Sequence, residues 1–261
     1  MFKNQRHDEI LEILKRERFA SVSDLSKRLF ASQPTIRRDL TLLEKQGYLR
    51  RSHGGAIPAD ERNNVPVSFR SGTHTQQKMR VCKLAAALIP IPDGSLIFTD
   101  ASTTALNIAN YIKEDAGITV LTNGYLACKR FLDKNIRVFS TGGKLLTDSL
   151  AFIGESARQT VTQYNADVFI FSSSSLSDDG MISDYSDEET SLRICMAKNA
   201  KIKVFLCDET KLGKSSAFNL FPLSEVDYAV TGAPLSIELT KKIGFELLSN
   251  DGAFLYKNNR K

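Results

Sequence analysis

Six short, mostly apolar runs in the second part of the sequence constrain the fold most. Runs of this length that do not alternate strictly with polar residues are typical of strands covered on both faces of a sheet. Helical stretches separate most of them, and alternation of this kind predicts an α/β layered domain with a largely parallel sheet. The predicted strands are residues 96–98, 118–121, 136–139, 168–171, 202–207 and 228–230. The predicted helices are residues 77–89, 103–113, 124–132, 155–163, 188–199 and 235–242.

The first 56 residues follow a different pattern, with three helical segments and a hairpin. Apolar residues at helical spacing predict a first helix from Gln5, and residues 19–22 are expected to be extended. We expect Ser23 to cap a second helix and Ser32 to cap a third, because a serine hydroxyl can accept from a free amide at a helix start. Residues 48–56 follow as a strand that closes on a Gly-Gly turn, which predicts a wing.

The third helix has two unlike faces. Ile36, Leu40 and Leu43 recur at helical spacing and predict a buried stripe. The opposite face carries a proline, two arginines, a threonine and a lysine, namely Pro34, Arg37, Arg38, Thr41 and Lys45. Guanidinium and hydroxyl groups suit phosphates and base edges in a major groove. For such a helix taken alone, a solvated basic face is the plain alternative.

A helix-turn-helix followed by a wing favours DNA binding over that alternative. Residues 1–55 hold 12 Lys and Arg against 7 Asp and Glu, whereas the remaining residues hold 23 of each. The whole net charge of +5 therefore lies where a polyanion would be attracted. We expect double-stranded DNA to be contacted by Ser32, Gln33, Pro34, Thr35, Arg37, Arg38, Thr41, Lys45, Arg50, Arg51 and His53.

Several function classes have little support. The amino terminus has no apolar signal segment and no later run is long enough to span a bilayer, so a cytoplasmic protein without membrane contact is expected. The four cysteines are isolated and the three histidines do not cluster. A metal site, a disulfide framework or a catalytic triad is therefore not expected, nor is a cofactor.

Residues 57–74 are polar, contain two prolines and lack periodicity, which predicts a linker. It would join a DNA-binding domain, residues 1–56, to an effector-binding and oligomerisation domain, residues 75–261.

In parallel sheets ligands collect at the carboxyl ends of strands. Four polar loops fall there, and turn or capping chemistry is the alternative reading of each. These loops are residues 99–104, 122–124, 141–143 and 208–213.

The first domain contains a set of residues with a recognisable spacing: Thr35-Ile-Arg-Arg-Asp-Leu40, Leu43-Glu44, Gly47, Leu49, Arg51 and His53-Gly-Gly-Ala56. These residues resemble the amino-terminal signature of the DeoR family of bacterial transcriptional regulators. The resemblance implies that the basic helix reads an operator and that the protein represses genes of sugar metabolism. It extends more loosely through the second domain, where it implies a fold like that of ribose-5-phosphate isomerase and CoA transferases.

The family's usual ligand is a phosphorylated sugar. By resemblance, the turn at 102–104 would hold the phosphate, and Asp100, Asn123 and Lys211 would face the sugar or its charge. The residues expected to bind the effector are Asp100, Ser102, Thr103, Thr104, Thr122, Asn123, Gly142, Gly143 and Lys211. Lys78 also matches a family lysine, with a surface role as the alternative.

The chain departs from the family's pattern at three places. Ser102 stands where the family has glycine, Arg193 stands where lysine is usual, and serines at 172–175 replace a glycine-containing loop.

We expect a ligand-responsive repressor that acts as a homo-oligomer on two half-sites. Two alternatives stay open: a DNA-binding oligomer that has lost or changed its ligand, and an isomerase-like enzyme with Asp100 as base.

Overall fold

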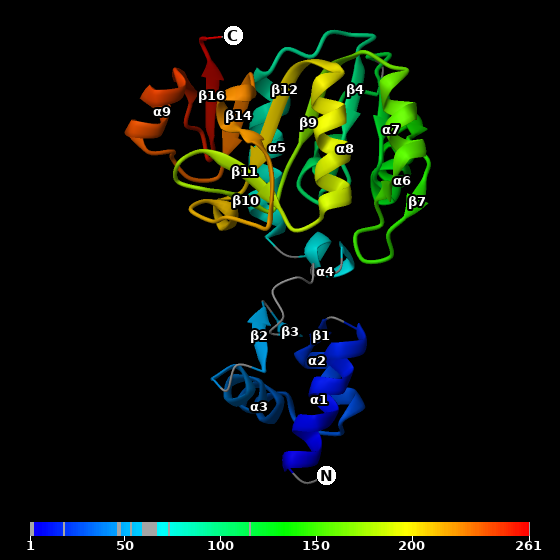
Figure 1. Cartoon of the computed structure of the whole chain (residues 1–261), viewed down its shortest axis with the longest axis vertical. Coiled ribbons are helices and arrows are strands. Elements are labelled where there is room, and N and C mark those ends of the chain that lie inside the picture. The colour runs from blue at the N-terminus through cyan, green and yellow to red at the C-terminus, as the bar shows by residue number, and fades with distance from the viewer. Residues whose placement is uncertain are drawn as a thin grey trace. The chain divides into compact units, whose positions relative to one another are not determined.

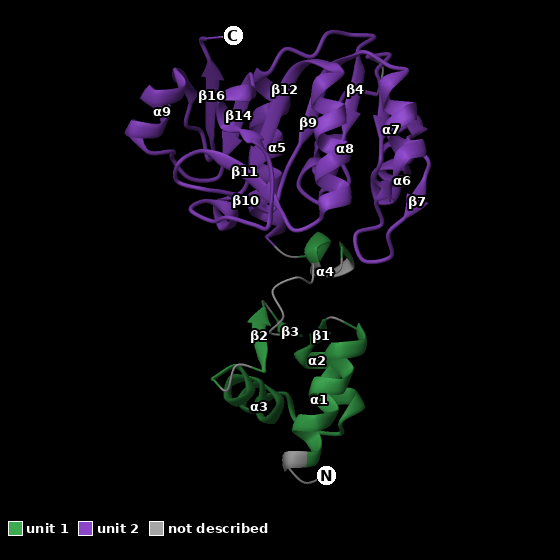
Figure 2. Ribbon diagram, viewed as in Figure 1, with its two compact units in different colours: residues 1–73 green, residues 74–261 purple. Residues whose placement is uncertain are grey.

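The computed structural model of the chain describes residues 3–17, 19–45, 48–52, 54–58, 67–72, 74–114 and 116–260 (Figure 1). It divides into two compact units, residues 1–73 and 74–261 (Figure 2). The first unit includes a short helix, α4 (Val67–Gly72), which falls within the stretch expected as a linker. Gly47 and His53, both named above, lie outside the described residues.

The first unit has the expected three helices and hairpin. They are α1 (Lys3–Glu17), β1 (Ala20–Ser21), α2 (Val22–Arg28), α3 (Gln33–Lys45), β2 (Leu49–Ser52) and β3 (Gly55–Pro58). The strands form an antiparallel sheet in the order β1-β3-β2. The expected cap of the second helix is wrong: Ser21 Oγ, not Ser23, accepts from Asp24 N at 2.9 Å. The helix therefore begins at Val22, and the side chain of Val22 is buried in the core.

The second unit is built on an eight-stranded sheet in the order β15-β16-β14-β12-β9-β4-β5-β6 (Figure 1). The six strands from β14 to β6 are all parallel, which confirms the prediction from the apolar runs. They are β4 (Leu96–Thr99), β5 (Thr119–Thr122), β6 (Arg137–Ser140), β9 (Ala166–Phe171), β12 (Ala200–Cys207) and β14 (Tyr228–Thr231). An antiparallel pair that was not predicted, β15 (Phe245–Ser249) and β16 (Phe254–Asn258), extends the β14 edge.

Helices cover both faces of this sheet. Ile97 and Phe98 are neighbours on β4 and belong to different hydrophobic clusters, because successive side chains of a strand point to opposite faces. Residues of α5 (Thr75–Leu88), the 3₁₀ helix η1 (Ala105–Asn110) and α6 (Tyr125–Leu132) complete the cluster of Ile97. Residues of α7 (Glu155–Thr162), α8 (Asp187–Lys198) and α9 (Ile237–Ile243) complete that of Phe98.

Some elements differ from the prediction. The helix expected at 103–113 is the shorter 3₁₀ helix η1. A small antiparallel sheet, β10 (Ser175–Leu176), β11 (Met181–Asp184) and β13 (Phe218–Pro222), was not foreseen, nor was the hairpin of β7 (Lys144–Leu145) and β8 (Phe152–Ile153). The remaining short helices are η2 (Glu209–Lys211) and η3 (Leu223–Glu225). Within the described residues, every helix falls short of the length and apolar character that a bilayer crossing needs.

Candidate DNA-binding surface and effector site

Helix α3 presents the two faces that its sequence predicts. Ile36 and Leu40 are fully buried and Leu43 nearly so. Ser32 Oγ lies 3.4 Å from the amide of Thr35 and 2.9 Å from its hydroxyl, so Ser32 caps the helix as expected. Most of the predicted DNA-binding residues are exposed, and Thr35 and Thr41 are half-buried. The exposed ones are Ser32, Gln33, Pro34, Arg37, Arg38, Lys45, Arg50 and Arg51.

The hairpin is tied to α3 through Arg51. Its guanidinium donates to Thr41 Oγ1 at 3.0 Å, and its backbone amide donates to Glu44 Oε1 at 2.7 Å. Within the described residues, no protein carboxylate pairs with the guanidinium of Arg37 or Arg38. Two adjacent cations on an exposed helix face are thus available to an external anion.

Asp39 points the other way, into the core of the first unit. It is 2% exposed, and it accepts from Arg6 Nε at 2.6 Å and lies 3.0 Å from His7 Nε2. Burial works against ionisation, but the hydrogen bonds from Arg6 and His7 outweigh it and hold the pKa of Asp39 below its ordinary value. Sequence reasoning gave Asp39 no role, although its place beside Leu40 on the apolar stripe could have indicated burial.

Polar residues of the second unit converge where neighbouring parallel strands end. Asp100, Asn123, Ser172 and Asp208 directly follow β4, β5, β9 and β12, and all four are buried. Because these strands are adjacent and parallel, their carboxyl ends share one edge of the sheet. The expected effector residues Ser102, Thr103, Thr104 and Thr122 are buried in the same region of the chain.

Two lysines enter this polar cluster. Lys211 Nζ, from η2, lies 2.9 Å from Thr104 Oγ1, 2.7 Å from Ser172 Oγ and 3.4 Å from Asp208 Oδ2. Lys78 Nζ, from α5, donates to Thr103 Oγ1 at 3.1 Å. Lys78 is only 5% exposed, so the surface role considered for it is wrong.

Both lysines lower the pKa of Asp208. Burial opposes the carboxylate, yet the Lys211 ammonium, the hydrogen bond from Thr210 and the charge of Lys78 lower the pKa of Asp208 below its ordinary value. The cluster therefore holds two ammonium groups beside threonine and serine hydroxyls, together with the carboxylate of Asp208. That combination can bind an anionic, hydroxylated ligand.

Arg193 of α8 organises the acidic side of the site. Its guanidinium donates to Asp100 Oδ2 at 2.7 Å, to Asp184 Oδ2 at 2.9 Å and to Glu189 Oε2 at 3.1 Å. Burial by itself would lower the pKa of Arg193, but these carboxylates, Asp184 foremost, raise it above the ordinary value. Asp100, expected to face a sugar, is fully buried and engaged by Arg193.

The Ser102 hydroxyl accepts a hydrogen bond from a backbone amide that a bound phosphate could otherwise accept. Its hydroxyl donates to Asp100 Oδ1 at 2.6 Å and accepts from the amide of Ala105 at 3.1 Å. Its φ is not positive, so the left-handed backbone that glycine would permit is not needed here. The amide of Ala105 is thus already bonded within the loop.

The predicted polar loop at residues 141–143 has a structural reason for its two glycines. Gly142 and Gly143 both have positive φ, at 62° and 103°. A β-carbon on Gly143 would lie 2.4 Å from the carbonyl oxygen of Ile153. The amide of Thr141 donates to Thr122 O at 3.0 Å, which places this loop beside the end of β5.

Buried polar atoms without partners mark the same edge. In the described residues, Thr99 Oγ1 and Asn123 Oδ1 are buried and lack a hydrogen-bond partner, and Asp208 Oδ2 has only its ion pair with Lys211. Buried polar atoms are nearly always hydrogen-bonded, to the protein or to something it binds. These three lie at or directly after the ends of β4, β5 and β12.

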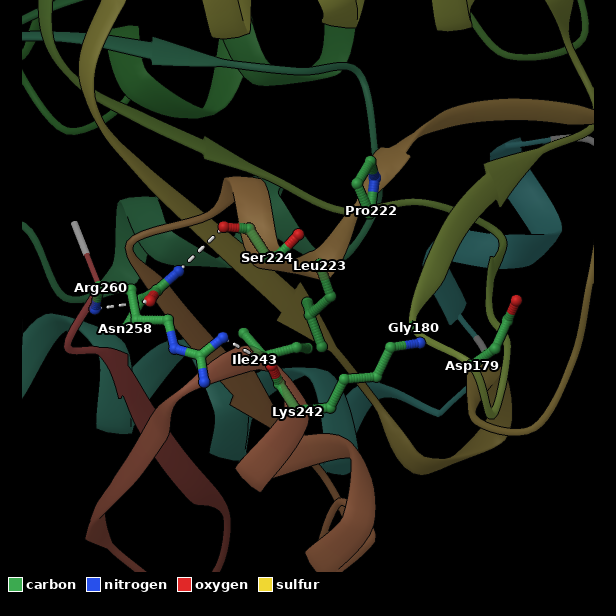
Figure 3. A pocket seen from close by; sticks show the side chains of 9 residues that line it. All are labelled: Asp179, Gly180, Pro222, Leu223, Ser224, Lys242, Ile243, Asn258 and Arg260. Atoms are coloured by element: carbon green, nitrogen blue, oxygen red, sulfur yellow. Dashed lines mark hydrogen bonds between the residues drawn. The ribbon is translucent and has the colours of Figure 1, made fainter.

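A separate pocket of about 390 Å³ lies between the small sheet, α9 and β16 (Figure 3). It shares no lining residue with the polar cluster. Its polar groups are largely engaged: Arg260 Nη1 donates to Lys242 O at 2.9 Å, and Asn258 Nδ2 donates to Ser224 O at 2.9 Å. We therefore place the ligand chemistry at the strand ends and not in this pocket.

A winged helix-turn-helix joined to an α/β unit with a polar strand-end cluster defines a two-domain DNA-binding regulator. The DeoR-like helix-turn-helix domain matches residues 6–62, and the DeoR C terminal sensor domain matches residues 73–233. The chain belongs to the DeoR family of transcriptional regulators. The first match spans α1 to β3, and the second contains the whole polar cluster.

Two of the similar proteins are themselves named as regulators. The glycerol-3-phosphate regulon repressor of Escherichia coli (strain K12) is 29% identical over 235 residues, which cover 90% of this chain and 92% of the relative. The HTH-type transcriptional regulator GolR of Listeria innocua is 30% identical over 244 residues, covering 93% and 95%. A solved ribose 5-phosphate isomerase A from Methanocaldococcus jannaschii matches with a TM-score of 0.40 and 17% identity, covering 72% of this chain and 83% of that one.

Proposed function

We propose that the chain is a cytoplasmic transcriptional repressor that binds a double-stranded operator as a homo-oligomer and is controlled by a phosphorylated sugar. Residues 1–56 form the DNA-binding domain, residues 57–74 connect it, and residues 75–261 sense the ligand and assemble the oligomer. The glycerol-3-phosphate named for the Escherichia coli relative supports a small phosphorylated ligand. The ligand acts by favouring one arrangement of the oligomer over another.

Two ammonium groups carry the sensing proposal: that of Lys78 is buried and that of Lys211 is partly buried. Lys78 and Lys211 bind the hydroxyls of Thr103 and Thr104, which are adjacent in the chain. Ammonium groups beside hydroxyls can make charge-assisted hydrogen bonds to a phosphate, so the pair favours an anionic ligand. Among the residues that the structure describes, Asn123 Oδ1 and Thr99 Oγ1 have no hydrogen-bond partner, which suits them to ligand hydroxyls. We propose that the effector is held by Asp100, Ser102, Thr103, Thr104, Thr122, Asn123, Gly142, Gly143 and Lys211, together with Lys78.

A thermal-shift panel of sugar phosphates and the matching free sugars tests this site. A ligand that binds only the folded protein must raise the melting temperature, so we expect a shift with one phosphorylated member and not with its free sugar. Lys211→Met should abolish that shift. Lys214→Met is the matched control, because Lys214 is exposed and its ammonium donates to the carbonyl of Thr210, outside the polar cluster. A shift retained in Lys211→Met would contradict the site.

The DNA-binding surface is tested with an operator selected from random DNA. Arg38→Ala on α3 should reduce operator preference, because its guanidinium faces the groove. Arg50→Ala on the hairpin should weaken binding to all sequences and lower the salt slope by about one, because it would lose one phosphate contact. If both variants bind operator and random DNA as wild type does, the DNA-binding surface has been placed wrongly.

One observation favours a second function, a DNA-binding oligomer without a ligand. Ser102 already bonds the amide of Ala105, which a phosphate could otherwise use. No thermal shift with any sugar phosphate, where a positive control responds, would support it. The isomerase alternative is disfavoured because Asp100, the base considered for it, is held by Arg193 and Ser102. Turnover of a sugar phosphate that is lost in Asp100→Asn would revive it.

A further inference from the structure

Phe30 is an aromatic side chain that the fold leaves almost entirely in water. It is 97% exposed, in the turn between α2 and α3. Among the other large apolar side chains of the described residues, the most exposed is Ile237 at 71%. Single exposed apolar residues are common on protein surfaces. The conformation and place of Phe30 set it apart from them.

The backbone at Phe30 is one that phenylalanine disfavours. Its φ is +49°, in the left-handed region, where the β-carbon crowds the carbonyl and glycine or asparagine is preferred. The turn is nevertheless held firmly, because Ala31 N donates to Ser26 O at 3.2 Å and Ser26 Oγ donates to Ala31 O at 2.6 Å. The ring is thus presented from a fixed turn at some cost in stability. Neither packing nor turn chemistry explains why phenylalanine stands here.

The turn lies at the end of α3 that meets DNA. A recognition helix enters the major groove with its amino-terminal residues at the base edges. Phe30 precedes the cap Ser32 by two residues, and the exposed Arg37 and Arg38 lie on the same helix. Apolar side chains, phenylalanine among them, contact the methyl group of thymine in that groove. The partner that fits an exposed ring at this position is therefore the operator itself.

We propose that Phe30 is a DNA-contacting residue whose ring packs on thymine methyl groups or the adjoining deoxyribose at the edge of a half-site. The inference rests on the proposed operator binding and adds an apolar contact to the basic surface. A phenylalanine ring buries a large apolar area on contact, and that area leaves water without displacing counterions. Loss of the ring should therefore lower affinity at every salt concentration without changing the salt slope.

The test uses the full chain, the selected operator, and the variants Phe30→Asn and Phe30→Tyr. Phe30→Asn suits the left-handed turn, so we expect its melting temperature to be at least that of wild type while operator affinity falls about tenfold. Phe30→Tyr keeps the ring and should keep the affinity. Leu132→Asn removes a side chain that is 60% exposed on α6 and should leave DNA binding unchanged.

Operators with uracil in place of thymine locate the contact. If the ring contacts a thymine methyl group, uracil should lower the operator affinity of wild type more than that of Phe30→Asn. An equal loss of affinity in both proteins would place the ring on deoxyribose. Unchanged operator affinity of Phe30→Asn, alongside weakened binding by Arg38→Ala, would overturn the role of Phe30 and leave operator binding intact. Wild type that selects no operator would instead overturn the proposed function.

Discussion

Arg193 joins three carboxylates that lie far apart in the sequence or on different elements. Asp100 follows β4, Asp184 ends β11, and Glu189 lies one helical turn before Arg193 on α8. All four side chains are at most 5% exposed. One guanidinium thus fixes the end of a central strand, the small sheet and a helix relative to one another. Its planar fork allows three separate donors, which an ammonium could not place in the same way.

Arg193→Met should destabilise the second unit strongly. It removes the partner of three buried carboxylates, and breaking a buried ion pair typically costs about 3–5 kcal/mol. Urea unfolding followed by circular dichroism measures the loss. Arg158→Met is the control, because its ion pair with Glu155 is exposed on both sides and should contribute little. Equal stability of the two variants would contradict a structural role for Arg193.

Asp39 gives the first unit a dependence on pH. Its pKa is held below the ordinary value of 3.8 by the hydrogen bonds of Arg6 and His7, which outweigh burial. A depressed pKa stabilises the folded state above the ordinary value, and that stabilisation is lost as the pH falls through the folded-state pKa. Asp39→Asn should therefore lower the free energy of unfolding by about 2 kcal/mol at neutral pH, with the difference shrinking below pH 3.8.

Hydrogen exchange of the amides in α1 and α3 reports this change. Asp24→Asn is the matched control, because the pair of Asp24 with Arg28 is about 40% exposed and a surface pair contributes little. A difference between wild type and Asp39→Asn that stays constant down to pH 2.5 would show that the carboxylate charge is not its source.

At the scale of the element, the hairpin of the first unit depends on a close backbone approach. Gly55 opens β3, and a β-carbon there would lie 2.3 Å from the carbonyl oxygen of Ala20 on β1 and 2.5 Å from the ring of Phe19. The neighbouring Gly54 has a φ of +80° but nothing within 4 Å of its would-be β-carbon. The two glycines are needed for different reasons.

Gly55→Ala should therefore separate β1 from β3 and lower both the melting temperature of the first unit and operator affinity. Gly54→Ala should cost only the left-handed conformation, about 1–2 kcal/mol. Differential scanning calorimetry with an operator titration compares them. Gly55→Ala that is no less stable than Gly54→Ala would show that β1 and β3 do not pack so closely.

Sequence patterns identified the parallel strands by their apolar runs. The central strands β4, β5 and β9 were found because their residues are mostly buried on both faces. The edge strand β6 was also found, although most of its residues are exposed. The β15–β16 pair was missed because β15 is a half-exposed edge strand, with Leu247 and Leu248 both exposed. Polar residues at strand ends were also found, since each follows its strand directly. Arg193 was not recognised as their organiser, because Asp100 is 93 residues away and only the fold brings the two together.

At the scale of the whole molecule, the proposed switch requires two sites whose occupation is linked. The operator site is assigned to the first unit and the effector site to the strand ends of the second, and these are separate compact units. A ligand can shift such an equilibrium only by its difference in affinity for the two states. In the proposed switch a homo-oligomer supplies those states, because an arrangement that fits two half-sites can be favoured or disfavoured when the ligand binds.

Linkage makes this proposal quantitative. If the sugar phosphate found in the thermal-shift panel weakens operator binding by a given factor, the operator must weaken ligand binding by the same factor, because the coupling free energy is shared. Isothermal titration of that ligand into the protein alone and into the protein–operator complex measures the second factor. A fluorescence-anisotropy titration of operator with and without ligand measures the first.

We expect both factors to agree and to lie between about 5 and 150, the usual range of allosteric coupling. In Lys211→Met the ligand should no longer bind, while operator affinity in its absence should match wild type, because Lys211 bonds to Thr104, Ser172 and Asp208 of the second unit. A ligand that binds the free protein and the operator complex equally well would show that the strand-end site is not coupled to DNA. In that case the second unit would bind its ligand without controlling the first.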